Sequence, residues 1–473
     1  MLRKAALIFA GNATGSALLL LRNLLVARMI PVADFGVAAT FALAMSVVEM
    51  LSALGLQQQI VQARDGDDPR FQAALQGFHL LRGAIAALLL VLLAGPLADF
   101  MGVPDVAWAY RVMALVPLLN GLVHFDIYRL SRGMEFRPMV LSGTLPPLVS
   151  VLSLYLLAVW FGDYRVMLYA ILVQAGMVVA ASHLVARRAY RLRLDSGVMA
   201  RSLRFGWPLL LNGILLFLVF QGDKIIVGRE LGMEDLAILS MGFTLTLAPT
   251  QLFARSAQSL FLPRLSAAQD EPERFQNLAM AAMQAVMVLG LVMLVGITLL
   301  GGPFVTLVLG ERYAALPVLL IWLALMQAIR VFKAGSAIVA LSRGQTTNAM
   351  IANLSRAVTL PLAWYAAVQG SDLATIIWIG IGGEIAGLVI AFAQLFWRLP
   401  LSPRRMALPA AGAAAALAVS VVYAVLIPAE AAGGFPPLWV WAGFALFGTG
   451  MVWTMRDLRR YLGRRLSQVG KRQ

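Results

Sequence analysis

The sequence predicts an all-α polytopic membrane protein with about fourteen transmembrane helices, and three observations support this fold class. Hydrophobic residues make up 60% of the 473-residue chain and charged residues only 13%, whereas soluble domains carry about 25% charged residues. The apolar residues fall into runs of about 20, the length that crosses the hydrocarbon core of a bilayer. Positive charges gather in alternate loops between these runs, as they do in membrane proteins.

The predicted spans follow one another along the chain and are separated by short polar breaks. Each is close to the length that a bilayer requires. In order, they cover residues 5–28, 35–56, 73–96, 106–128, 139–161, 164–186, 206–228, 236–258, 277–300, 314–340, 347–369, 373–397, 406–427 and 437–455. The first span resembles a secretory signal, but it has no convincing small-residue cleavage site and another apolar run follows at once, so we expect an uncleaved helix.

The distribution of Arg and Lys predicts the orientation of these spans. If Arg3 and Lys4 are cytoplasmic, the loops that follow every second span are rich in Arg, and the loop from Gly95 to Asp105 on the other side has no Arg or Lys. Both termini are then cytoplasmic, and we expect a multi-pass protein of the inner membrane. The net charge of +15 follows from this topology, so no nucleic-acid partner is expected.

Short sequence echoes indicate that the chain contains two related halves. Each echo recurs at an equivalent place between spans, and their order is the same in both halves. The echoes pair Val26-Ala27-Arg28 and Asp34-Phe35-Gly36 with Val227-Gly228-Arg229 and Asp235-Leu236-Ala237, Arg70-Phe71-Gln72 with Arg274-Phe275-Gln276, and Leu130-Ser131-Arg132-Gly133 with Leu341-Ser342-Arg343-Gly344. Repeats that are six spans apart have the same topology, so they predict two parallel lobes that enclose a central cavity and rock about it.

The predicted organisation therefore has four parts. Two six-helix lobes cover residues 1–193 and 206–400, and a basic cytoplasmic linker at 194–205 joins them. Residues 401–473 supply two extra transmembrane helices and a basic cytoplasmic tail.

Charged residues inside the predicted spans are the candidate functional residues, because intramembrane charges commonly mark a pathway. Basic residues predominate, and a cavity that solvates an anion would explain this excess. The candidate substrate-binding cations are Arg22, Lys224, Arg330, Lys333 and Arg356. The candidate ion-coupling carboxylates are Glu49, Asp223 and Glu384.

Two structural alternatives remain open for these charges. Long basic side chains can extend to the membrane interface, and we favour this for Arg82, which lies near a span end. Arg356 and Glu384 lie too deep to do so easily, and pairing with each other is as plausible for them as a transport role.

The sequence has no motif that predicts catalysis. Cysteine is absent, and His79, His124 and His183 are isolated, so neither a thiol nucleophile nor a metal site is expected. The chain lacks a Walker lysine motif, a nucleophile elbow and a dinucleotide-binding glycine pattern. We therefore expect no enzyme and no cofactor, with energy supplied by a membrane potential or a gradient.

Several loose motifs resemble those of polysaccharide biosynthesis transporters, the lipid-linked oligosaccharide flippases of the multidrug/oligosaccharidyl-lipid/polysaccharide superfamily. The resemblance covers roughly the first 400 residues. It rests on Leu24-Leu25-Val26-Ala27-Arg28 with Asp34-Phe35-Gly36, Gly55-Leu56-Gln57-Gln58, Phe205-Gly206-Trp207-Pro208, Asp223-Lys224 and Leu260-Phe261-Leu262-Pro263-Arg264.

The resemblance implies a V-shaped bundle of two lobes with a cationic central cavity. It also implies a substrate, an undecaprenyl-diphosphate-linked oligosaccharide that moves from the cytoplasmic to the periplasmic leaflet for O-antigen or exopolysaccharide biosynthesis. Membrane lipids and a polysaccharide polymerase are the implied partners. About fourteen spans exceed the twelve that are common in the family but match some exopolysaccharide and peptidoglycan-precursor members, so the branch stays open.

Three other functions agree less well with the sequence. An ion-coupled multidrug or metabolite antiporter of the same superfamily should favour acidic residues in its cavity for organic cations, which the basic excess argues against. A polysaccharide polymerase or ligase would need a large external loop, and no outside loop is long enough. A membrane scaffold would not require charges near the bilayer midplane.

Overall fold

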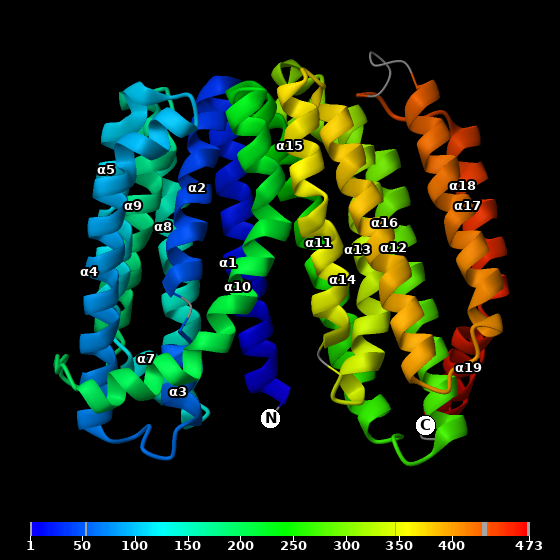
Figure 1. The fold of residues 1–473 in the computed structure, drawn as a ribbon, viewed down its shortest axis with the longest axis horizontal. Coiled ribbons are helices and arrows are strands. Elements are labelled where there is room, and N and C mark those ends of the chain that lie inside the picture. The colour runs from blue at the N-terminus through cyan, green and yellow to red at the C-terminus, as the bar shows by residue number, and fades with distance from the viewer. Residues whose placement is uncertain (1, 53, 346, 428–432, 471–473) are drawn as a thin grey trace. The chain divides into compact units, whose positions relative to one another are not determined.

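The computed structural model describes the backbone of residues 2–52, 54–345, 347–427 and 433–470, and helices dominate these residues. Contacts divide the chain into two compact units, Met1–Ala237 and Ile238–Gln473. Figure 1 labels most of the helices of both units. The predicted all-helical fold class is confirmed at this level, whereas the predicted lobe boundaries stay a prediction.

The first unit contains α1 to α10 and the beginning of α11. Within it α1 packs on α8, α8 packs on α9, α4 packs on α5 and α6, and α10 packs on α2 and α4. The helices are α1 Leu2–Met29, α2 Val32–Ser52, α3 Leu56–Gln62, α4 Pro69–Phe100, α5 Ala107–Met113, α6 Leu115–Gly121, α7 Asp126–Arg132, α8 Arg137–Trp160, α9 Arg165–Leu184 and α10 Ser196–Glu230, with a 3-10 turn at Pro104–Val106.

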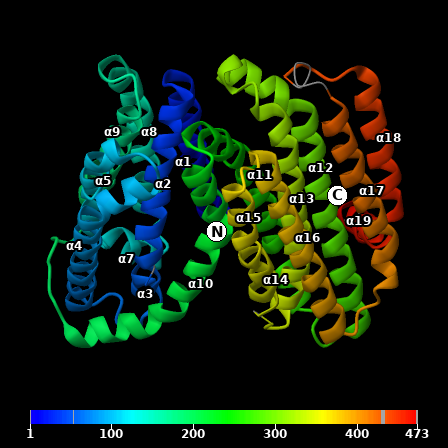
Figure 2. The same ribbon diagram turned by 45° about the horizontal axis from the view of Figure 1, so that its top comes forward.

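The second unit contains the rest of α11 and all later helices. Here α13 packs on both α12 and α16, α14 packs on α16, and α17 and α19 pack on α12. The helices are α11 Met233–Ser266, α12 Pro272–Leu309, α13 Leu316–Ser342, α14 Thr347–Val358, α15 Leu360–Val368, α16 Leu373–Arg398, α17 Arg404–Leu426, α18 Leu438–Thr454 and α19 Arg456–Gly470, with a 3-10 turn at Glu311–Tyr313. Figure 2 gives a second view of the helices within each unit.

Eight helices of the described residues are long and apolar enough to cross a membrane, or up to ten if each of two bent helix pairs forms one span. A helix, or a run of consecutive helices, overlaps every predicted span, but some of these helices are too short for this criterion or contain side chains outside the described residues. For example, α14 has 12 residues, and several side chains of α1, α2 and α10 lie outside the described residues. The count of about fourteen spans therefore stays a prediction.

The sequence echoes occupy corresponding places on their helices. Pro69 and Pro272 each stand in the first turn of a long helix, α4 and α12, where a missing N–H costs nothing. The motifs that contain Arg28 and Arg229 each lie near the end of a helix, α1 and α10. This correspondence is what a duplicated architecture predicts.

Asp195 begins α10 inside the segment that the sequence analysis treats as a linker. Its carboxylate accepts hydrogen bonds from the backbone N–H groups of Gly197 and Val198, both at 3.0 Å, and so caps the helix. The first part of α10 lies across the end of the unit that holds α3 and α7 (Figure 1). Gly206 permits close packing there, because a Cβ would lie 2.6 Å from the Cα of Leu54. The basic segment is therefore largely helical and fixed to the first unit.

Candidate functional site

Four charged side chains, which we call the cation cluster, lie inside the second unit where α13, α14 and α16 pack together. They are Arg330 and Lys333 of α13, Arg356 of α14 and Glu384 of α16. Arg330 Nε donates to Glu384 Oε1 at 2.6 Å, and Lys333 Nζ donates to Glu384 Oε2 at 2.9 Å. Arg356 Nε lies 4.0 Å from Glu384 Oε1.

The cation cluster is deeply buried and more accessible on one side. The side chains of Glu384 and Arg356 have no exposed surface, whereas Lys333 is 12% exposed. Among these four side chains, the positive charges outnumber the negative charges by two. Intramembrane charges commonly mark a pathway, and this arrangement is suited to an anion that approaches from the side of Lys333.

Neutral groups hold the guanidinium groups in place. Arg356 Nη1 donates to Thr359 Oγ1 at 2.8 Å, and the side chain of Gln327 accepts from Arg330. Glycines let Arg356 lie against α16, because a Cβ at Gly380 would be 3.0 Å from Arg356 Nη2. Gln327 and Thr359 are not among the predicted site residues, although each stands three residues from an Arg and so lies on the same helical face.

The other predicted cations lie in the first unit. Arg22 of α1 is half-buried and donates from Nη1 to Gln174 Oε1 of α9 at 2.5 Å. Lys224 of α10 is half-buried and follows Asp223, which is 5% exposed. The side chain of Glu49 lies outside the described residues. The structure thus brings three of the predicted cations together with Glu384.

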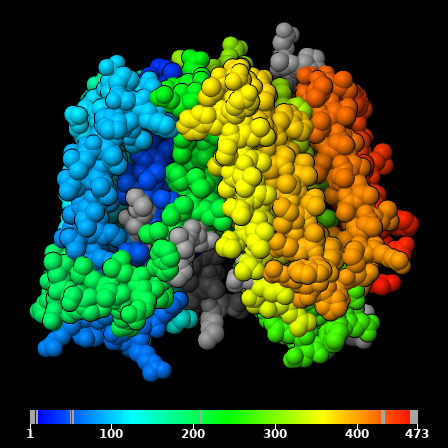
Figure 3. All heavy atoms as spheres, in the orientation of Figure 1, coloured from blue at the N-terminus to red at the C-terminus, as the bar shows by residue number. Residues whose placement is uncertain are grey.

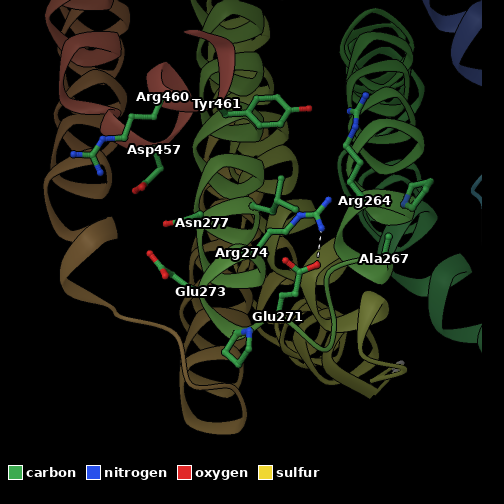
Figure 4. Close-up of a pocket in the computed structure, with 12 residues that line it drawn as sticks. Arg264, Ala267, Glu271, Glu273, Arg274, Asn277, Asp457, Arg460 and Tyr461 are labelled. Atoms are coloured by element: carbon green, nitrogen blue, oxygen red, sulfur yellow. Dashed lines mark hydrogen bonds and ion pairs between the residues drawn. The ribbon is translucent and has the colours of Figure 1, made fainter. Parts of the chain in front are cut away.

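A separate cavity of about 910 Å³ lies at the ends of α11, α12 and α19 (Figure 4). Arg274 points toward Glu271 and donates to it at 2.6 Å. Besides this pair, the lining contains Arg264 and Arg460 together with Glu273 and Asp457. Positive and negative side chains are therefore equal in number, so this cavity lacks the cationic excess of the cation cluster.

No group of three or more His, Asp and Glu side chains is placed to hold a metal ion within the described residues. Asp126, at the start of α7, instead has a structural role. It is fully buried, and its carboxylate accepts from Arg129 Nε at 2.6 Å and from the backbone N–H of Arg187 at 2.7 Å. It therefore connects α7 to the segment that precedes α10.

The sequence matches a family model described as polysaccharide biosynthesis protein over residues 25–317. Among curated proteins, the chain is similar to the succinoglycan biosynthesis transport protein ExoT of Rhizobium meliloti (strain 1021). The two are 25% identical over 386 residues, which cover 80% of this chain and 76% of that protein.

Two solved structures have a similar fold. The first is the lipid II flippase MurJ in an inward closed conformation, with a TM-score of 0.72 and 12% identity over 98% of this chain and 100% of that one. The second is an inward-facing multidrug resistance MATE family transporter of the MOP superfamily, with a TM-score of 0.64 and 15% identity over 81% of this chain and 93% of that one. The fold is thus that of a multi-pass membrane protein of this type, and because the family model covers more than half of the sequence, the chain belongs to the polysaccharide biosynthesis protein family.

Proposed function

We propose that this protein is a flippase that moves an undecaprenyl-diphosphate-linked oligosaccharide from the cytoplasmic to the periplasmic leaflet of the inner membrane. The family, the similarity to a named succinoglycan transport protein and the fold shared with a lipid II flippase support this activity. The substrate would serve O-antigen or exopolysaccharide biosynthesis, and a polysaccharide polymerase that extends the delivered glycan is the expected partner. Both termini are expected in the cytoplasm.

The cation cluster is the observation on which the proposal depends. Arg330, Lys333 and Arg356 contact a single carboxylate in a largely buried position, and forked guanidinium donors suit phosphate oxygens. A diphosphate that leaves the aqueous side would interact with these positive charges. This interaction would lower the free-energy barrier to crossing the membrane. Arg22 and Lys224 are proposed to contact the same headgroup at another stage of alternating access.

Glu384 is proposed to be the counter-ion that holds the cation cluster together when substrate is absent. Both of its oxygens accept hydrogen bonds from cations, and release of Lys333 would expose that ammonium group to the diphosphate. The assignment of Glu384, Asp223 and Glu49 to ion coupling stays a prediction.

Reconstitution tests the proposal directly. Purified protein in vesicles should move a fluorescent undecaprenyl-diphosphate-linked oligosaccharide between leaflets without any change in glycan length, measured by accessibility to a membrane-impermeant reagent. Growth of the glycan would indicate a polymerase or ligase instead. Vesicles that neither translocate nor extend the substrate would contradict the proposal.

A further inference from the structure

An apolar groove runs along the first unit between α2, α4 and α10. It has a volume of about 380 Å³, and its lining includes Leu43, Ala86, Leu89, Leu93 and Phe217. Figure 3 shows α2 set back between α4 and α10. Leu89 and Leu93 are 44% and 54% exposed, so the groove is open along α4 and can admit a hydrocarbon chain.

A second cavity in the same unit has a different chemistry. Its volume is about 600 Å³, and its lining includes the side chains of Gln57, Gln58, His79 and Asn120. Amide groups both donate and accept hydrogen bonds, which suits the hydroxyl groups of a sugar. Both volumes lie within the range that is usual for ligand sites.

Arg82 lies where the two cavities meet, since it lines both of them. Its Nη2 is 3.0 Å from Nδ1 of His79, a neutral partner. Its Nε is buried and has no hydrogen-bond partner among the described residues. No Asp or Glu is among the described residues that line either cavity. A cation with a spare donor, an apolar groove on one side and amides on the other is complementary to an amphipathic anion.

We propose that Arg82 binds the phosphate of the lipid-linked glycan, with the first isoprenoid units in the apolar groove and the first sugar in the polar cavity. This inference rests on the proposed function and adds a substrate-binding residue to it. The sequence favours an interfacial position for Arg82, whereas the structure places it half-buried beside both cavities. Its spacing from Ala86, Leu89 and Leu93 puts one charged and three apolar residues on one face of α4.

The relative size of the cavities favours a glycolipid over a membrane phospholipid. The polar cavity, at about 600 Å³, is larger than the apolar groove. A phospholipid headgroup would leave most of it unfilled, and two acyl chains would compete for one groove. A single isoprenoid chain with a sugar on its diphosphate matches both the apolar groove and the polar cavity.

Binding of undecaprenyl-diphosphate-linked N-acetylglucosamine to the detergent-purified full chain tests the inference. Arg82→Gln should weaken binding at least about tenfold, the effect of losing a charge-assisted contact, and Arg82→Lys should retain most of it. Leu89→Trp should also weaken binding because the indole ring fills the groove. Leu88→Trp is the matched control: Leu88 is 59% exposed on the same helix and lines neither cavity, so its binding should equal that of the wild type.

Four results would overturn the inference. The first is unchanged affinity in both Arg82→Gln and Leu89→Trp, with wild-type thermal stability showing that each variant is folded. The second is an equal loss of binding in the Leu88→Trp control. The third is equal competition by phosphatidylglycerol vesicles, which would indicate a phospholipid site, and the fourth is equal competition by inorganic diphosphate, which would indicate a free-phosphate site. Failure of this inference and failure of the proposed function are distinguishable. Arg82-dependent binding can persist in a protein that translocates nothing, and translocation can persist when Arg82 does not affect binding.

Discussion

The buried cations of the two units have different kinds of partner. The second unit gathers Arg330, Lys333 and Arg356 around the carboxylate of Glu384. In the first unit, Arg22 contacts the neutral side chain of Gln174, and Arg82 contacts His79 at the wall of two cavities. A carboxylate fixes a cation where it is, whereas a neutral partner leaves its charge available to a ligand. Substrate must therefore displace an ion pair to reach the cations of the second unit. Arg22 and Arg82 of the first unit can bind substrate without breaking an ion pair among the described residues.

The largest effect on stability is expected when the second unit loses the carboxylate of Glu384. Glu384→Gln keeps the shape of the side chain but removes the carboxylate that Arg330, Lys333 and Arg356 contact, which should lower the free energy of unfolding by about 3–5 kcal/mol. Denaturant titration of the purified protein measures this loss. The matched control is Glu271→Gln, whose side chain is 57% exposed and bonded to Arg274; it should cost less than about 1 kcal/mol. If the two variants were equally stable, the cation cluster would not depend on its carboxylate.

A smaller effect is expected at the corresponding contact in the first unit. Arg22→Gln removes one hydrogen bond to Gln174 but leaves no unpaired charge behind, so we expect a loss of about 1–2 kcal/mol. The same titration checks the value. A loss as large as that of Glu384→Gln would erase the distinction between the two units.

The smallest effect is expected at an exposed ion pair on the first unit. Arg201 donates to Asp65 through two nitrogens at 2.7 and 3.1 Å, and this guanidinium lowers the pKa of the Asp65 carboxyl. Since the pKa is lower in the folded state, the pair stabilises the protein fully above about pH 4 and loses its contribution as the pH falls through the folded value. Asp65→Asn should therefore cost at most about 1 kcal/mol at pH 7 and less in acid.

Unfolding of Asp65→Asn and wild type at pH 7 and at pH 3 measures that difference. The double variant Asp65→Asn/Arg201→Gln is the control, and it should match the single variant at pH 7. A cost that grew as the pH fell would contradict the assignment.

The helices and the identity of the charged residues could be predicted from the sequence because both depend on local pattern. Arg330 and Lys333 are three residues apart, so their common face follows from helical geometry alone. Their joint contact with Glu384 depends on the packing of α13 on α16, and no local pattern specifies it. The depth of Arg356 and Glu384 in their spans makes a pair between them plausible, yet Arg330 and Lys333 make the shorter contacts with Glu384.

The site around Arg82 could not be predicted from the sequence either. Arg82 lies near the end of a predicted span, which favours a position at the membrane interface. The two cavities that it lines are formed by residues from α2, α3, α4, α6, α7, α9 and α10. Such a site exists only after these helices have packed, so periodicity and charge counts could not have predicted it.

The most direct test of the account is translocation by the variant Arg330→Gln/Arg356→Gln in vesicles. The substitutions remove the excess positive charge but leave Lys333 paired with Glu384, so the protein should still be expressed and folded. Arg459→Gln/Arg460→Gln, which removes the same charge from exposed positions on α19, is the matched control. The account predicts that the first variant abolishes movement of undecaprenyl-diphosphate-linked oligosaccharide and that the second retains it, whereas unimpaired movement by the first variant would contradict the role of the cation cluster.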